Sequence, residues 1–368
     1  MMEYIKAEIN SGVGCITLNR PTTLNALTLD MICQLTNLLI DWRDNSEVEA
    51  VAIRGCNKAG PFGDFCAGGD IRFFYLASTK KDKSLSDFFT AEYRLTHLIY
   101  NYPKPYIAFM DGVVMGGGMG LSQGASFRVV TERTRMAMPE TNIGFFPDVG
   151  ASFFLNRCDN NIGKYIGITG QVLSGNDAVA VGLADGVLMS SELHDNWDLL
   201  TNSRLTKVSD RINKLQIHCM NLKDNIHTPS WFDPHLILTF GQETLGKALE
   251  RLVESDGEWA KKTLQKLKER SPIMLYITFK QLIYGQSLTL AECLRMERDL
   301  AQHCFYPTHP TRVGMSNETI EGIRALVIDK DFSPSWNPKN LDDVTSEMIE
   351  PFFKSPWLPS EHPLADLK

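Results

Sequence analysis

The chain of 368 residues is 43% hydrophobic and 22% charged, a composition typical of folded globular proteins rather than of disordered ones. Its net charge of −7 and its pI of about 5.7 argue against a nucleic-acid-binding protein that relies on phosphate contacts. The longest apolar stretch, residues 106–121, is interrupted by Asp111 and several glycines, so the sequence predicts no membrane span.

The eight cysteines are scattered and form no Cys-x-x-Cys pair, which disfavours a zinc ribbon or a thioredoxin-type site. We expect reduced, mostly buried thiols in an intracellular protein. The first ten residues carry Glu3 and Glu8 and no long apolar segment, unlike a signal or transit peptide. We therefore expect a cytoplasmic location.

Residues 1–205 alternate short apolar strands with amphipathic helices. Strands are predicted at residues 16–18, 51–53, 106–110, 129–130 and 136–138. A helix is predicted over residues 30–42, because apolar residues recur there at helical spacing. These residues are Met31, Leu35, Leu38 and Trp42. Repeated strand, turn and helix units indicate an α/β fold in which helices cover a sheet.

From residue 206 onward the apolar residues follow a helical period, which predicts a mainly helical C-terminal region. The expected helices cover residues 241–255, 257–270, 272–284, 287–305 and 318–330. Six of the 17 prolines fall after residue 330, so regular structure should be sparse there. The sequence thus predicts two regions, residues 1–205 and residues 206–368.

Two glycine-rich segments can offer backbone N–H groups to a ligand. Residues 65–70 place Gly69 ahead of Asp70, which suits the N-cap of a following helix; a plain tight turn is the alternative. Residues 115–120 follow a predicted strand and open a helix, where unpaired N–H donors can stabilise an oxyanion. The second segment matches neither a Gly-x-Gly-x-x-Gly fingerprint nor a P-loop, so a phosphate cradle is not expected.

Residues 138–148 form a predicted loop that holds two carboxylates, Glu140 and Asp148, among methionine and phenylalanine residues. Apolar neighbours would desolvate these carboxylates and raise their pKa values, which suits acid/base catalysis near neutral pH. Two simpler interpretations stay open: Asp148 as the N-cap of the next helix, and Glu140 as a solvated loop acid.

Glu92 lies in a predicted helix over residues 85–102, on one stripe with Phe88, Leu95 and Ile99. A carboxylate on an apolar stripe needs a partner, because burial without one is costly. A functional role and a buried ion pair both remain open for this residue.

A competing motif is the Gly-x-Ser-x-Gly pattern of residues 120–124, which resembles a nucleophile elbow centred on Ser122. An elbow requires the serine on the turn itself. The glycines at 116–118 already make that turn, so Ser122 is expected inside the helix and a serine hydrolase is disfavoured.

Taken together, these motifs resemble the crotonase (enoyl-CoA hydratase/isomerase) superfamily. Residues 19–27 resemble its N-terminal signature, and residues 65–70 and 115–120 resemble its two oxyanion-hole segments. Residues 138–150 and parts of 271–330 are similar to its 3-hydroxyisobutyryl-CoA hydrolase branch. The resemblance implies a crotonase-like spiral of β-β-α units, with an acyl-CoA-binding catalytic core followed by the helical region.

The resemblance also implies roles for the site residues. The N–H groups of Gly69 and Gly117 would form an oxyanion hole for the thioester carbonyl. Glu140 would activate water or attack the carbonyl itself, and Asp148 would assist proton transfer. The implied substrate-binding residues are Glu92, Gly69, Asp70 and Gly117.

The sequence departs from the hydratase pattern at Gly120, where hydratases carry a second catalytic glutamate. Hydration should therefore be poor, and we expect a hydrolase of short 3-hydroxyacyl-CoA thioesters, led by 3-hydroxyisobutyryl-CoA of valine breakdown. An enoyl-CoA hydratase or isomerase is the alternative, and an acyl-CoA binder without turnover is a third. We expect no metal, no cofactor beyond the CoA of the substrate, and no nucleic-acid or membrane partner; a homo-oligomer is left open.

Overall fold

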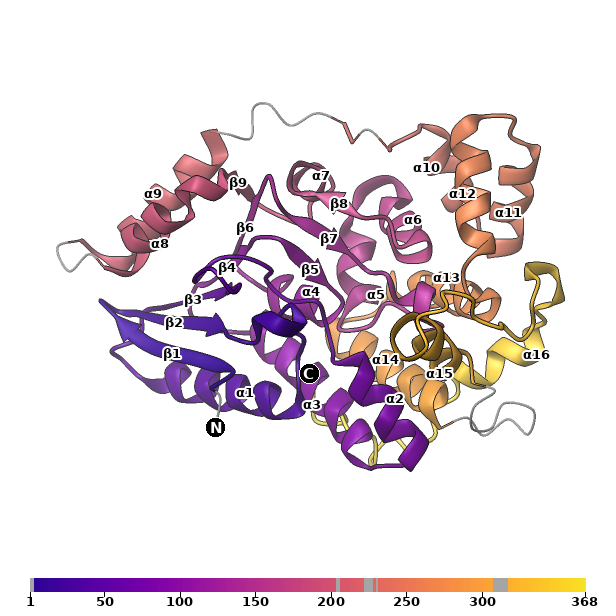
Figure 1. Ribbon diagram of the computed structural model, residues 1–368, viewed down its shortest axis with the longest axis horizontal. Coiled ribbons are helices and arrows are strands. Elements are labelled where there is room, and N and C mark those ends of the chain that lie inside the picture. Colours follow the sequence, from indigo (N-terminus) through magenta and orange to yellow (C-terminus); the bar gives the residue numbers. More distant parts are fainter. Residues whose placement is uncertain (1–2, 203–205, 222–227, 230, 307–316) are drawn as a thin grey trace. The chain divides into compact units, whose positions relative to one another are not determined.

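The computed structural model describes residues 3–202, 206–221, 228–229, 231–306 and 317–368 (Figure 1). Its strands are β1 (Ile5–Asn10), β2 (Val13–Leu18), β3 (Ala50–Gly55), β4 (Tyr106–Met110), β5 (Val113–Met115), β6 (Phe127–Thr131), β7 (Arg135–Ala137), β8 (Leu173–Ser174) and β9 (Gly186–Leu188). Its α-helices are α1 (Leu29–Asp44), α2 (Ile71–Lys80), α3 (Ser84–Tyr100), α4 (Gly117–Ser122), α5 (Ala151–Phe154), α6 (Ile162–Thr169), α7 (Gly175–Ala180), α8 (Leu193–Thr201), α9 (Val208–Asn221), α10 (His235–Phe240), α11 (Leu245–Glu254), α12 (Glu258–Lys268), α13 (Pro272–Gly285), α14 (Leu290–Phe305), α15 (Glu318–Ile323) and α16 (Ser346–Ile349).

The chain forms two compact units, and each consists of three chain segments. The first comprises Met1–Gly69, Leu95–Ala137 and Val172–Ser230, and the second Asp70–Arg94, Met138–Gln171 and Trp231–Lys368. Helix α3 contributes to both, because the division falls within it. These units differ from the two predicted regions, whose boundary at residue 205 lies inside the first unit. The difference arises because two segments of the first 205 residues pack with the C-terminal helices.

A six-stranded sheet lies at the centre of the first unit, in the order β1-β2-β3-β4-β6-β9. β1 and β2 are antiparallel, whereas every later pair is parallel. β4 is buried along its whole length, as expected for a parallel strand covered on both faces. A smaller sheet has the order β5-β7-β8. The strands predicted from the sequence are therefore confirmed, and β1, β5, β8 and β9 add to them.

The start and the buried face of helix α1 in the first unit follow from its local sequence. Its N-cap is Thr28, whose hydroxyl accepts a hydrogen bond from the N–H of Met31 (3.3 Å). The buried stripe continues through Leu39 rather than the predicted Leu38, which is only half-buried. The prediction was one position off, because two adjacent leucines fit the helical period almost equally well.

Helices α8 and α9 complete the core of the first unit. Trp197 and Leu200 of α8 and Leu215 of α9 share one buried cluster with Ala52 and Phe109 of the sheet. Neither helix was predicted, because turn residues and charges interrupt their apolar pattern.

The second unit is mainly helical, and α13 is its most buried long helix. It begins after the N-cap Ser271 and packs against α5 and α6. The C-terminal helices predicted from periodicity are confirmed, but the last one continues beyond α15 as a π-helical turn at Arg324–Ile328. After residue 330 the structure holds only short helical turns, which confirms the expectation from the prolines.

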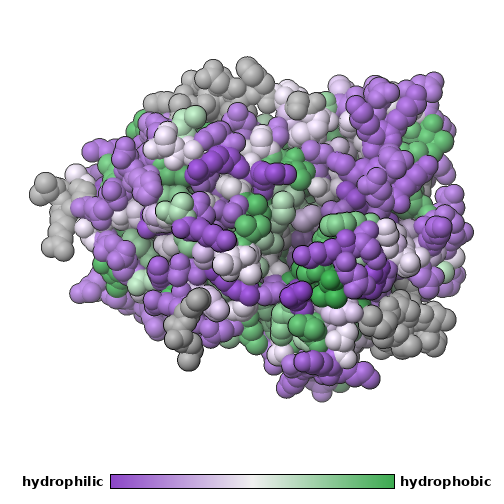
Figure 2. Space-filling view, in the orientation of Figure 1, coloured by the Kyte–Doolittle hydropathy of each residue, from purple (hydrophilic) through white to green (hydrophobic). Residues whose placement is uncertain are grey.

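Among the described residues, no helix combines the length and the apolar character that crossing a membrane requires. Hydrophilic side chains cover most of the face seen in Figure 2, and apolar side chains appear there in small separate groups.

A cluster of aromatic rings fills the second unit around Phe89 of α3, which is 2% exposed. Its ring centroid lies 5.1 to 5.8 Å from those of Phe74, Phe88, Phe145 and Phe305. These contacts bury a large apolar area, and the pair Phe88–Phe89 adds edge-to-face attraction.

Replacement of this central ring should strongly destabilise the protein. We expect Phe89→Ala to lower the free energy of unfolding by about 3–5 kcal/mol, because the cavity cannot close around it. Urea unfolding followed by circular dichroism measures the loss. Phe332→Ala is the matched control, since Phe332 is 68% exposed, and an equal loss in both variants would contradict the prediction.

Candidate active site

The two glycine-rich segments lie side by side in the first unit. Backbone hydrogen bonds join them, from Cys66 N–H to the Val113 carbonyl and from Met115 N–H to the Cys66 carbonyl (both 2.9 Å). A Cβ on Gly68 would lie 3.3 Å from the amide nitrogen of Gly117. Within the first unit, the segments that carry the two predicted oxyanion donors therefore run together.

The amides of Gly69 and Gly117 are available as donors. Gly117 is the first residue of α4, where a helix offers its N–H no internal acceptor. Among the described residues, neither amide donates a hydrogen bond to another protein group. These two N–H groups fit the predicted oxyanion hole.

Glycine is required at two further positions of this arrangement. Gly116 caps α4 with a φ of 48°, in the left-handed region that favours glycine. A Cβ on Gly118 would lie only 2.4 Å from the carbonyl oxygen of Cys66. The run of glycines thus reflects backbone conformation and close approach of the two segments.

Gly118→Ala should force the two segments apart. We expect a loss of about 1–3 kcal/mol in unfolding free energy, because backbone rather than a flexible side chain blocks the added methyl group. Gly246→Ala in α11 is the control, since its nearest neighbour would lie 3.9 Å away. That change should be neutral or stabilising. Thermal unfolding compares the two variants, and equal stability would contradict the prediction.

Asp70 and the helix after it are as predicted. Asp70 is the N-cap of α2, and its side chain accepts a hydrogen bond from the N–H of Phe73 (3.3 Å). The interpretation as an N-cap is confirmed.

Glu140 is buried, so its interpretation as a solvated loop acid was wrong. It begins a 3₁₀ turn, Glu140–Ile143, which ends at Gly144 with a φ of 65°. The N–H of Phe145 donates to the Glu140 carbonyl (3.0 Å), and the Thr319 hydroxyl donates to the Gly144 carbonyl (2.6 Å). The turn is therefore fixed at both ends, while the carboxyl oxygen Oε2 is buried and has no hydrogen-bond partner among the described residues.

Asp148 is also buried and does not cap the next helix. The N-cap of α5 is Gly150, and the side chain of Asp148 makes no capping hydrogen bond to this helix. The interpretation of Asp148 as an N-cap was wrong, because its carboxyl instead accepts a hydrogen bond from the hydroxyl of Tyr93 (2.8 Å).

Glu92 lies on α3, one residue before Tyr93, and is 5% exposed. Its oxygen Oε1 has no hydrogen-bond partner among the described residues. The alternative of a buried ion pair was wrong, because no cation of the described residues pairs with this carboxyl.

The three carboxyls influence one another. Burial raises the pKa of Glu92 well above its usual range, and the charges of Asp148 and Glu140 raise it further. Burial likewise raises the pKa of Glu140, again with help from Asp148. Burial raises the pKa of Asp148 to about 7, although the Tyr93 hydroxyl opposes the increase. The second unit thus holds three interacting acids whose pKa values are all raised, and raised pKa values of this kind are typical of acid/base sites.

Ser122 is buried within α4, as expected. Its hydroxyl donates to the carbonyl of Gly118 (2.9 Å), and no described histidine bonds to it. Two histidines that follow Ser122 in the sequence are engaged elsewhere: His218 contacts Glu192 (3.3 Å), and the ring of His194 packs edge-on against Phe62. Ser122 therefore has the surroundings of an ordinary helix residue.

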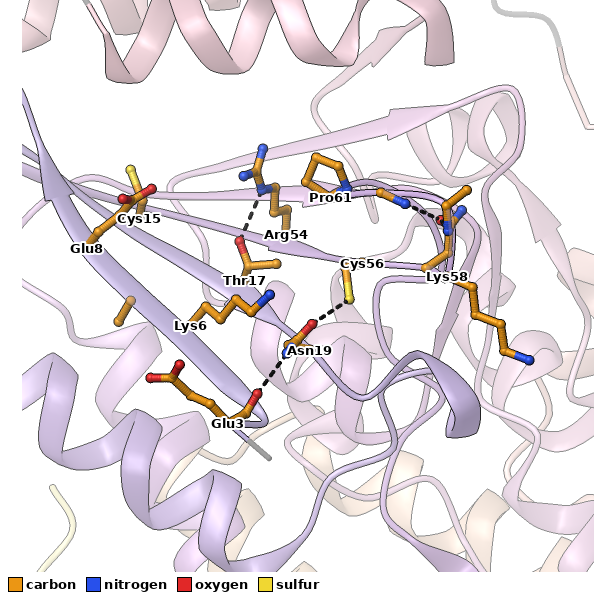
Figure 3. A pocket seen from close by; sticks show the side chains of 14 residues that line it. Glu3, Lys6, Glu8, Cys15, Thr17, Asn19, Arg54, Cys56, Lys58 and Pro61 are labelled. Atoms are coloured by element: carbon orange, nitrogen blue, oxygen red, sulfur yellow. Dashed lines mark hydrogen bonds between the residues drawn. The ribbon is translucent and has the colours of Figure 1, made fainter. Parts of the chain in front are cut away.

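A cavity of about 630 Å³ opens on the first unit (Figure 3). It is lined by side chains of β1, β2 and β3 and of the loop at residues 56–61. Arg54 donates to the Thr17 hydroxyl there (3.1 Å). None of the predicted site residues lines this cavity.

Possible metal-binding side chains and the cysteines were predicted from the sequence to play no part in a metal or disulfide site. Among the described residues, no cluster of three His, Cys, Asp or Glu side chains is arranged to hold a metal ion. All eight cysteines are free, and all but Cys33 are buried, which confirms the expectation of reduced thiols.

Two polar residues near Asp148 were missed from the sequence. Tyr93 stands next to Glu92 on α3, and Glu297 of α14 accepts hydrogen bonds from the segment after Asp148. Glu297 shares a buried stripe with Leu294 and Ala301, so its place in the apolar period was the available signal.

The comparisons with known proteins define the class. The family model for enoyl-CoA hydratase/isomerase matches residues 13–353. The chain therefore belongs to the enoyl-CoA hydratase/isomerase family, and the predicted superfamily is confirmed.

Relatives within this family point to one branch. The chain is 38% identical to 3-hydroxyisobutyryl-CoA hydrolase, mitochondrial, of Xenopus laevis, over 93% of this chain and 86% of that protein. It is 37% identical to the protein of the same name from Homo sapiens, over 96% and 89%.

Solved structures confirm the predicted crotonase-like α/β fold. A carnitinyl-CoA dehydratase from Mycobacterium thermoresistibile matches with a TM-score of 0.81 and 29% identity, over 96% of this chain and 97% of that one. An enoyl-CoA hydratase from Rhodobacter sphaeroides matches with a TM-score of 0.78 and 29% identity, over 96% and 98%.

Proposed function

We propose that this protein hydrolyses short 3-hydroxyacyl-CoA thioesters, with 3-hydroxyisobutyryl-CoA as the leading substrate and 3-hydroxyisobutyrate and CoA as products. The observation that carries the proposal is Glu140, a buried carboxyl with an unpartnered oxygen and a raised pKa. The relatives named 3-hydroxyisobutyryl-CoA hydrolase support the same reaction.

In the proposed mechanism the amides of Gly69 and Gly117 bind the thioester carbonyl oxygen. Negative charge develops on this oxygen as the carbonyl carbon becomes tetrahedral. Loss of one such donor costs about 2.7–4 kcal/mol of transition-state stabilisation in other enzymes, so the hole would be a major catalytic contribution.

Glu140 acts on the carbonyl carbon by one of two routes. As a general base it takes a proton from water, whose oxygen bonds to the carbon while the carbon–sulfur bond breaks. As a nucleophile it forms a mixed anhydride that water then hydrolyses. In both routes the CoA sulfur leaves as a thiolate and takes up a proton.

Asp148 orients the water or the substrate hydroxyl, and Glu92 binds the hydroxylated acyl group.

The proposed reaction draws on no metal or redox cofactor, because a thioester carbonyl is already activated and CoA arrives with the substrate. A role in valine breakdown follows if 3-hydroxyisobutyryl-CoA is the substrate. The cytoplasmic location and a homo-oligomer stay predictions. The relatives, by contrast, are named as mitochondrial proteins.

Hydration of an enoyl-CoA is the second candidate, because structurally similar proteins are named as a hydratase and a dehydratase. Gly120 argues against it, since this buried position of α4 carries no acid/base group. The deciding experiment incubates the protein with a panel of short acyl-CoA thioesters. Thiol release supports hydrolysis, whereas loss of enoyl absorbance without thiol release would replace the proposal with hydration.

Glu140→Gln should abolish thiol release. We expect kcat to fall by about 10²- to 10⁴-fold, because the amide can neither accept a proton nor attack the carbonyl. Glu361→Gln is the control, since Glu361 is exposed. If Glu140→Gln releases thiol as fast as the wild-type protein, Glu140 has no catalytic role. If the wild-type protein itself releases thiol, it is not an acyl-CoA binder without catalytic activity.

The pH dependence of kcat/KM should reflect the pKa of Glu140 and the influence of Asp148 on it. The base must be deprotonated, so the raised pKa of Glu140 moves the loss of kcat/KM on acidification to higher pH than for an ordinary carboxyl, and the rate rises as pH increases through this pKa. Because the Asp148 charge raises the pKa of Glu140, Asp148→Asn should move the midpoint of this rise to lower pH, although the maximal rate also falls. Steady-state rates between pH 5 and pH 9 measure the midpoint, and an unchanged midpoint would contradict the prediction.

A further inference from the structure

Glu297 of α14 is fully buried and has no part in the mechanism above. Both of its carboxyl oxygens accept hydrogen bonds from backbone groups of one short segment. The N–H of Gly150 donates to Oε2 (2.7 Å), and the N–H of Ser152 donates to Oε1 (3.0 Å). The Ser152 hydroxyl adds a bond to Oε1 (2.5 Å). One side chain therefore binds three donors directly after Asp148.

The segment that Glu297 binds has a strained backbone. Val149 has a φ of 54° and Gly150 a φ of 87°, and a β-branched residue such as valine rarely adopts the first value. Such a conformation persists only where its surroundings hold it. On the other side of Asp148, the amide of Gln281 donates to the Pro147 carbonyl (2.6 Å).

The next residue of α14 bonds to the helix that carries the hydrogen-bond donor of Asp148. The guanidinium of Arg298 donates to the hydroxyls of Thr90 (3.1 Å) and Ser86 (2.5 Å) on α3. The same part of α3 carries Tyr93, which donates to Asp148. Two successive residues of α14 thus tie down both the loop that carries Asp148 and the helix that carries its hydrogen-bond donor.

We infer that Glu297 is a positioning residue, whose carboxyl holds the left-handed turn at Val149–Gly150 and so aims the side chain of Asp148. The inference rests on the proposed function, because it assigns Glu297 a role in that reaction. It requires that the turn loosen when one of the two carboxyl oxygens is lost.

Glu297→Gln is the direct test, because glutamine has the same shape but only one oxygen for two backbone N–H groups. We expect kcat to fall by about 10- to 100-fold with KM within about threefold, since Asp148 loses its alignment while binding groups stay in place. Hydrogen exchange at residues 148–152, followed by mass spectrometry, should accelerate by about tenfold or more.

His303→Ala is the matched control on the same helix. His303 is buried and bonds through its ring to the Lys354 carbonyl (2.8 Å) rather than to residues 147–152. It should lower the melting temperature while kcat, KM and exchange at residues 148–152 stay as in the wild type. Equal losses of kcat in both variants would show that Glu297 supports only the fold.

Further outcomes separate the inference from the proposed function. Wild-type kcat in Glu297→Gln overturns the inference, whatever the exchange shows. If the wild-type protein releases no CoA from any thioester, the proposed function falls, and the exchange comparison still decides whether Glu297 holds the turn. If Glu297→Gln does not fold, Glu297→Asp replaces it, since this variant keeps both carboxyl oxygens but shortens the reach, and its kcat should fall by a smaller factor.

Discussion

Exclusion of water from carboxyl groups is the constraint on which the chemistry of the second unit depends. Glu92, Glu140 and Asp148 are buried, and the ring of Tyr93, which donates to Asp148, lies 6.1 Å from the ring of Phe89 in the aromatic cluster. Each charged form is disfavoured there, so the acids hold their protons to higher pH than in water. A protein pays for such burial in stability, which is why unpartnered buried acids are rare outside functional sites.

The glycine segments meet a different demand, since they must present backbone rather than side chains. Close approach of the Gly118 backbone to the Cys66 carbonyl brings two chain segments to the same place in the first unit. Amides at the start of a helix are then left without internal acceptors, as Gly117 shows. In the first unit, glycines leave backbone N–H groups free to donate hydrogen bonds. In the second unit, apolar surroundings raise the pKa values of buried acids.

Sequence reasoning predicted most helices and strands, because long apolar periods and turn residues determine them locally. It also singled out Glu140 and Asp148, whose apolar neighbours in the loop are visible in the sequence. It could not decide whether Asp148 caps a helix, because the competing donor, Tyr93, lies 55 residues away along the chain. Glu297 was missed for the same reason, since its partners Gly150 and Ser152 come close only in the folded chain.

Val149 shows what such an arrangement means for the evolution and engineering of heat resistance. A glycine at this position would relieve the left-handed backbone conformation, but it would also remove a fully buried side chain and make the unfolded chain more flexible, so it should destabilise the native state. The same change would also give the neighbouring Asp148 more freedom. Selection for thermal tolerance would therefore tend to keep the valine despite its backbone conformation, and a screen that scores only survival on heating would preserve the turn beside Asp148 as well.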